Sequence, residues 1–105
     1  MIEGRRSPRV VFQIPIRIVG SGSACDGRTA VVNRHGALIL CPVLYPDEST
    51  LQITNPESGE IAPFRVVWWG EDDAKGMHKA GVEMLEDRLH FWGPAYESKL
   101  AEIED

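Results

Sequence analysis

The chain lacks most of the features that would mark an enzyme, a metalloprotein or a membrane protein. It has two cysteines but no Cys-x-x-Cys pair, and no group of cysteines and histidines has the spacing of metal ligands. No serine lies in a Gly-x-Ser-x-Gly turn, and no Gly-Lys-Ser/Thr follows the glycine-rich segment at 20–23. No apolar run approaches the length of a membrane span, and we expect no signal peptide ahead of the domain. We therefore expect a non-catalytic, cytoplasmic protein without a metal, a cofactor or a membrane-inserted segment.

The composition is that of one small globular domain. The chain has 105 residues, of which 43% are hydrophobic and 26% are charged. Its formal net charge of -5 argues against general binding to DNA or RNA. The charge is uneven, because arginines dominate residues 1–20 and acidic residues dominate residues 83–105. These two ends could attract each other or different partners, or they could simply be solvated.

Short alternating segments separated by turn residues predict an all-β fold. Residues 9–19 alternate between apolar and polar side chains, as expected of a half-buried strand. Asparagine and glycine tolerate a positive φ, so Asn33 to Gly36 is predicted to be a tight hairpin turn. After Pro94, apolar residues recur at helical spacing, namely Tyr96, Leu100 and Ile103. The expected strands are 9–19, 29–32, 37–40, 50–54, 60–69 and 78–85, which suggests a small antiparallel barrel with a short C-terminal helix.

Two aromatic pairs stand in the second half of the chain. Alternation along the strand at 60–69 places Trp68 in the core and Trp69 on the opposite face. We expect Trp69 to pack under the terminal helix, because large aromatic side chains usually cover something. Phe91 and Trp92 are expected to anchor the tail to the barrel, and the alternative is that they offer a docking surface.

A cluster of three arginines lies just ahead of the first strand. Arg5, Arg6 and Arg9 carry guanidiniums, which stay charged and offer a rigid fork of donors that suits phosphate oxygens and purine edges. The cluster could therefore hold an anionic ligand. The alternative is a solvated, frayed terminus.

The order of these segments resembles the PilZ domain family over almost the whole chain. The resemblance is carried by Arg-x-x-x-Arg at 5–9, by a strand that runs into Asn33-Arg34-His35-Gly36, and by a later strand with Ala80-Gly81-Val82-Glu83. It implies a single domain over 1–105, with a basic arm at 1–9, a six-stranded antiparallel PilZ-like β-barrel at 10–85 and a tail with a helix at 86–105. It also implies cyclic di-GMP as a possible ligand.

The family's ligand motifs map onto individual residues of this chain. Arg5 and Arg9 match the two arginines that clamp phosphates and contact guanine in the family, and Arg6 lies between them. In the second motif, of the form Asp/Asn-x-Ser-x-x-Gly, Gly36 matches the glycine and Asn33 falls at the serine position. Val31 stands where the family has Asp or Asn, so this motif is degenerate.

Two further residues of the same turn are candidates for contacts with the ligand. Arg34 could reach a phosphate or a guanine edge, and His35 could stack on a base or form a hydrogen bond that depends on pH. The alternative for both is an exposed turn pair without a ligand. The predicted ligand-binding set is therefore Arg5, Arg6, Arg9, Asn33, Arg34, His35 and Gly36.

Two hypotheses for the function follow. In the first, the chain is a cyclic di-GMP receptor or adaptor module in bacterial second-messenger signalling that passes its signal to a protein partner. In the second, motivated by Val31, it is a degenerate PilZ-like domain that binds no nucleotide and serves as a protein-interaction module. Its contact surface would then be the acidic tail together with Phe91 and Trp92.

Overall fold

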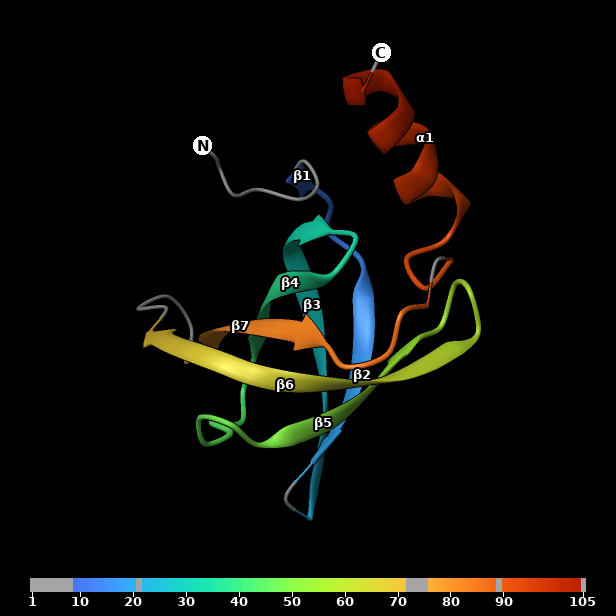
Figure 1. Cartoon of the computed structure of the whole chain (residues 1–105). Coiled ribbons are helices and arrows are strands. Elements are labelled where there is room, and N and C mark those ends of the chain that lie inside the picture. The colour runs from blue at the N-terminus through green and yellow to red at the C-terminus, as the bar shows by residue number, and fades with distance from the viewer. Residues whose placement is uncertain (1–8, 21, 72–75, 89, 105) are drawn as a thin grey trace.

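The computed structural model describes residues 9–20, 22–71, 76–88 and 90–104. Seven strands and one helix make up this part of the chain (Figure 1). The elements are β1 (Val10–Val11), β2 (Pro15–Gly20), β3 (Ser23–Asn33), β4 (Gly36–Cys41), β5 (Thr50–Asn55), β6 (Glu60–Glu71), β7 (His78–Met84) and α1 (Pro94–Glu104).

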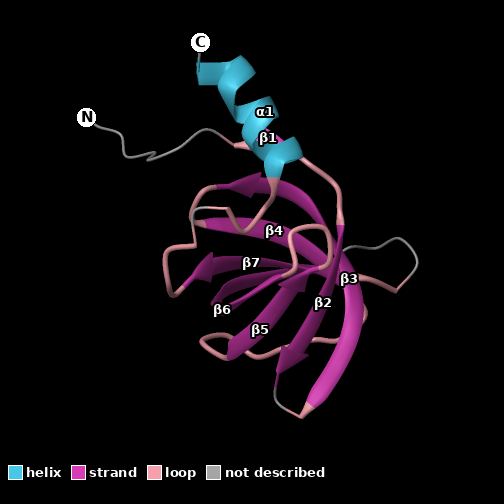
Figure 2. Cartoon of the chain, turned by 90° about the vertical axis from the view of Figure 1, so that its right-hand side faces the viewer, coloured by secondary structure: helices cyan, strands magenta, loops and turns pink. Residues whose placement is uncertain are grey.

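The sheet is antiparallel and closes on itself. Its strand order is β1-β3-β2-β5-β6-β7-β4, and a further pairing of β3 with β4 joins the two sides. Strands β2 to β7 therefore form a six-stranded barrel, with β1 added at the upper part of β3. The helix α1 lies over the end of the barrel where β1 pairs with β3 (Figures 1 and 2). The predicted six-stranded barrel with a short C-terminal helix is confirmed.

The core follows from the alternation of side chains along the strands. In β2, Ile16 and Ile18 are buried, while Arg17 and Val19 point outward. The inward side chains of the other strands meet them, including Leu51, Ile53, Phe64 and Val66, all of which are fully buried. Because the sheet closes on itself, these inward faces share one interior, and buried side chains of the C-terminal segment complete that core.

The strand expected at 9–19 is broken into β1 and β2. Residues 12–14 lie between the two strands, and the buried hydroxyl of Thr29 bridges this gap. It donates to the carbonyl oxygen of Phe12 and accepts the amide of Ile14 at 3.0 Å. Buried backbone groups need such partners, and the hydroxyl adds to two backbone hydrogen bonds across the break, from Phe12 N–H to the carbonyl oxygen of Ala30 and from Thr29 N–H to that of Ile14. Alternating burial predicted the inward residues but could not show this interruption.

The next strand starts earlier than its sequence pattern indicates. β3 begins at Ser23 rather than Thr29, because Ala24 to Arg28 pair with β2 in a continuous antiparallel register. Asp26 and Gly27 have a low strand propensity, so their pairing with β2 results from the tertiary fold rather than from the local sequence. The glycine-rich segment at 20–23 connects β2 to β3, and Gly20 pairs with Ser23.

The C-terminal segment is anchored to the barrel. Phe91 and Trp92 are 0% and 2% exposed, so the expected anchoring is confirmed and these rings are not a docking surface. Tyr96 of α1 is buried against Phe12, with ring centroids 5.9 Å apart. Leu100 is also buried, whereas the side chain of Ile103 lies outside the described residues. The rings of Phe91, Trp92 and Tyr96 thus join the segment after β7 to the barrel.

Candidate ligand-binding site

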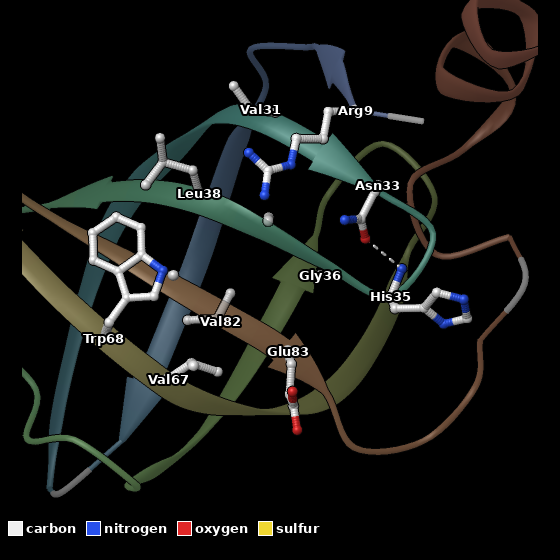
Figure 3. Close-up of a pocket in the computed structure, with 12 residues that line it drawn as sticks. Arg9, Val31, Asn33, His35, Gly36, Leu38, Val67, Trp68, Val82 and Glu83 are labelled. Atoms are coloured by element: carbon white, nitrogen blue, oxygen red, sulfur yellow. Dashed lines mark hydrogen bonds between the residues drawn. The ribbon is translucent and has the colours of Figure 1, made fainter. Parts of the chain in front are cut away.

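A pocket of about 340 Å³ lies on the outer face of the barrel. Strands β3, β4, β7 and β6 form its floor side by side, and Arg9 stands at its rim just before β1 (Figure 3). Its polar lining residues are Arg9, Asn33, His35 and Glu83, and its apolar lining residues are Val31, Ala37, Leu38, Val67, Trp68 and Val82, of which Val82 belongs to the core and Ala37 packs against it. The pocket therefore combines a cationic, polar end with an apolar end.

Two irregularities in the strands aim side chains into this pocket. The register of β6 against β7 shifts between Val66 and Trp68, and that of β3 against β4 shifts between Thr29 and Val31. A β-bulge of this kind adds one residue to a strand and re-aims the side chains after it. Val31 and Trp68, the residues directly after the two shifts, both line the pocket.

The bulge in β6 overturns the prediction that Trp68 belongs to the core. Trp68 is 45% exposed and its neighbour Val67 is 42% exposed. In a regular strand, two consecutive side chains cannot both point outward. Trp69 takes the inward position instead and packs against the core with the ring of His78, at a centroid distance of 6.0 Å. The extra residue carries no sequence signal, so alternation assigned the two indoles to the wrong faces.

The indole of Trp68 lies over a glycine. A Cβ atom on Gly81 would stand 2.2 Å from Nε1 of Trp68 and 2.6 Å from its Cε2, too close for any real contact. The absence of a side chain on Gly81 thus lets the indole lie against β7, and both residues line the pocket. Gly81 belongs to the later strand that carries the family resemblance, and its contact with Trp68 links it to the site.

Hydrogen bonds hold the turn at 33–36 in place. The side-chain Oδ1 of Asn33 accepts the amide of His35 at 2.8 Å. The carbonyl oxygen of Asn33 accepts the indole N–H of Trp92 at 3.1 Å, and that of His35 accepts the amide of Met84 at 2.7 Å. The turn is thereby fixed both to β7 and to the segment that leads into α1. Such pre-ordered groups cost little further entropy on binding a ligand.

Gly36 is needed for a reason other than the one the sequence suggested. Neither Asn33 nor Gly36 has a positive φ. A Cβ on Gly36 would instead lie 2.3 Å from the carbonyl oxygen of Val82, so this glycine permits the close approach of β4 to β7. The hairpin prediction was right, but its conformational argument was wrong.

The structure brings part of the predicted site together. Arg9, Asn33, His35 and Gly36 line one pocket although Arg9 is far from the others in sequence. Arg34 is exposed on the same turn and is not among the residues that line the pocket. Arg5 and Arg6 lie outside the described residues. Sequence interpretation missed Trp68, Val67, Leu38, Ala37, Val82 and the lining role of Glu83.

The one acidic side chain that the structure shows among the lining residues is held by an arginine. Glu83 accepts a hydrogen bond from Arg65 at 2.7 Å, and Arg65 also binds Glu48 at 2.8 Å. These two carboxylates raise the pKa of the Arg65 guanidinium, mainly through their hydrogen bonds. In Figure 3 the carboxylate of Glu83 is turned away from Arg9 and Trp68. Its negative charge is thus partly compensated and directed away from the cationic end of the pocket.

Other candidate chemistry in the described part of the chain is sparse. No group of three or more histidine, cysteine or acidic side chains there could hold a metal ion, and no described helix is long and apolar enough to cross a bilayer. Cys25 and Cys41 are free thiols, and both pack with the barrel core. Burial raises the pKa of Cys41 to about 11, so its thiol stays protonated and unreactive at neutral pH.

The fold and the pocket together define a small antiparallel barrel with a ligand-sized recess on its outer wall. The sequence model of the PilZ domain matches residues 3–91, which is most of the chain. The chain belongs to the PilZ domain family. Among solved structures it is similar to the PilZ domain of CeSA from a cellulose-synthesizing bacterium, with a TM-score of 0.61 and 19% sequence identity. That match covers 94% of this chain and 100% of the other. The comparison with curated proteins gives no significant match.

Proposed function

We propose that this chain is a cyclic di-GMP-binding receptor or adaptor module of bacterial second-messenger signalling, acting in the cytoplasm by binding rather than by catalysis. One observation carries the proposal: Arg9 and the turn of Asn33 to Gly36 line the same pocket as the exposed indole of Trp68. The family to which the chain belongs supports the choice of ligand.

The pocket's two ends suit the two chemical parts of such a ligand. The guanidinium of Arg9 offers charge-assisted hydrogen bonds to a phosphate, and the side-chain Nδ2 of Asn33 lies on the same side (Figure 3). The indole of Trp68 offers a flat surface on which a purine can stack, an interaction worth about 1–3 kcal/mol per base. Arg5 and Arg6 belong to the proposed site through the arm's motif, and they would add cations to the same phosphates.

Isothermal titration of the 105-residue chain with cyclic di-GMP tests this proposal directly. We expect binding that is abolished in the double variant Arg5→Ala with Arg9→Ala and weakened in Asn33→Ala. Arg17→Ala is the matched control, because Arg17 is paired with Asp26 at 3.0 Å on a part of the barrel outside the pocket. An absence of heat and of any melting shift at hundreds of micromolar ligand would refute the proposal.

The presence of Val31 in the pocket favours a second candidate, a PilZ domain that binds no nucleotide and contacts a protein partner. An aliphatic side chain there cannot accept hydrogen bonds from a base. Since Phe91 and Trp92 are buried, a partner would meet the rest of the acidic C-terminal tail instead, where Glu102 is exposed. Failure of the native chain to bind cyclic di-GMP, combined with binding by Val31→Asp, would identify residue 31 as the cause and support this second candidate.

A further inference from the structure

Glu83 belongs to a row of cross-strand neighbours that leads into the pocket. In the strand registers, Glu83 of β7 has Arg65 of β6 on one side and Gly36 of β4 on the other. Asn33 of β3 follows as the partner of Gly36. Paired residues of an antiparallel sheet point to the same face, so the side chains of this row are direct neighbours. Because Gly36 has no side chain, nothing in the row separates Glu83 from Asn33, and these three residues all line the pocket.

The carboxylate of Glu83 is held on the side of the row that leads away from Asn33. Nη2 of Arg65 donates to Oε2 of Glu83 at 2.7 Å, and the carboxylate is accordingly turned away from Arg9 (Figure 3). Without that bond, the carboxylate would be free to lean over Gly36 toward Asn33 and Arg9. Its negative charge would then stand where the phosphates of an anionic ligand have to bind.

A loop residue with an unfavourable backbone conformation holds Arg65 in its orientation. Glu48 has a φ of 69°, and within the described ranges it is the one residue other than glycine with a positive φ. Such a conformation is strained for an ordinary side chain, so surrounding contacts must maintain it. The amide of Glu48 donates to the carbonyl oxygen of Val66 at 2.9 Å, and its carboxylate accepts Nη1 of Arg65 at 2.8 Å. Both ends of Glu48 are thus fixed to β6, and the guanidinium is held between two carboxylates.

From this arrangement we propose that Arg65 is a positioning residue of the ligand site, which holds the carboxylate of Glu83 out of the pocket so that an anionic ligand can bind. The inference rests on the proposed function. Arg65 is not among the residues that line the pocket, so it acts through Glu83 rather than by contact with the ligand. The pocket thereby stays cationic although an acidic residue lines it.

Isothermal titration with cyclic di-GMP compares the native chain with Arg65→Gln. This variant should fold, because the side chain of Arg65 is 35% exposed and exposed ion pairs add little to stability. We expect its Kd to be about tenfold higher, because the released carboxylate repels the phosphates and competes for Arg9. The ratio of the two Kd values should shrink at about 0.5 M sodium chloride, since salt screens exposed charges.

The double variant Arg65→Gln with Glu83→Gln should restore Kd to within about threefold of the native value, because the amide carries no charge. Arg65→Gln with Glu48→Gln has the same net charge, but Glu48 does not line the pocket, so this chain should bind as weakly as Arg65→Gln alone. Arg17→Gln is the control for the loss of an exposed, paired arginine and should leave Kd unchanged, because Arg17 binds Asp26 at 3.0 Å outside the pocket.

The outcomes separate the inference from the proposed function. A folded Arg65→Gln chain that binds as tightly as the native chain overturns the inference and leaves the function intact. A loss that Glu83→Gln does not rescue, or that Glu48→Gln rescues equally well, also overturns the inference. A native chain that binds no cyclic di-GMP overturns both.

Discussion

Replacing Gly81 by alanine should damage ligand binding far more than stability. The new Cβ would stand 2.2 Å from Nε1 of Trp68, whereas ordinary contact begins at 3.4 Å, so the indole must move by the difference of about 1.2 Å. Trp68 is 45% exposed and can swing into solvent rather than push the strands apart. We therefore expect the free energy of unfolding to fall by less than about 1 kcal/mol.

The cost to binding can be worked from the same contact. A displaced indole no longer lies flat beside the base, and loss of one stacked base costs about 1–3 kcal/mol, or roughly five- to 150-fold in Kd. Isothermal titration with cyclic di-GMP and thermal melting by circular dichroism measure the two effects separately. Adding Gly81→Ala to a Trp68→Ala chain should cause little further loss, because both substitutions remove the same platform. Additive losses, or a collapse in melting temperature with unchanged Kd, would refute this explanation.

Three further predictions concern the supports of the site. Gly36→Ala places a Cβ 2.3 Å from the backbone of β7 and should lower the free energy of unfolding by about 1–3 kcal/mol. The midpoint of urea unfolding should then fall, and an unchanged midpoint would contradict this prediction. Trp92→Phe removes the indole donor to Asn33 and should cost about 1 kcal/mol together with some ligand affinity, whereas stability and Kd equal to those of the native chain contradict a role for this bond. The carboxylate of Glu97 raises the pKa of His90, first through their hydrogen bond. Protonated His90 therefore stabilises the fold at low pH, and this stabilisation is lost as the pH rises through the raised pKa. His90→Gln should therefore lower the melting temperature slightly at pH 5.5 and not at pH 8, and an equal effect at both would refute the linkage.

The fold was largely predictable because its elements are local in origin. Residues 10–19 alternate regularly enough to predict every inward side chain of β1 and β2, and burial confirms that face. The helix after Pro94 was predicted from the spacing of Tyr96 and Leu100, and both are buried. The start of β3 was missed because Ala24 to Arg28 pair with β2 despite their weak propensity. That pairing depends on the partner strand, which local sequence does not report.

The candidate site was only half predictable. The motif resemblance placed Arg9, Asn33, His35 and Gly36 together, and the structure puts all four around one pocket. Trp68 was assigned to the core, because the sequence at 66–68 contains no pattern that predicts a bulge. The bulge becomes visible only in the register between β6 and β7.

The sequence by itself determined the barrel, the terminal helix and the family, since alternation, turn residues and motif order are properties of the chain alone. Only the tertiary structure decided which side chains share the pocket. It showed that Gly36 and Gly81 are glycines because neighbouring strands and an indole approach them, not because of their own φ angles. It also showed that Asn33 presents a donor, since its oxygen is already bound. Such contacts join residues far apart in sequence, and their chemistry follows from packing that no local pattern encodes.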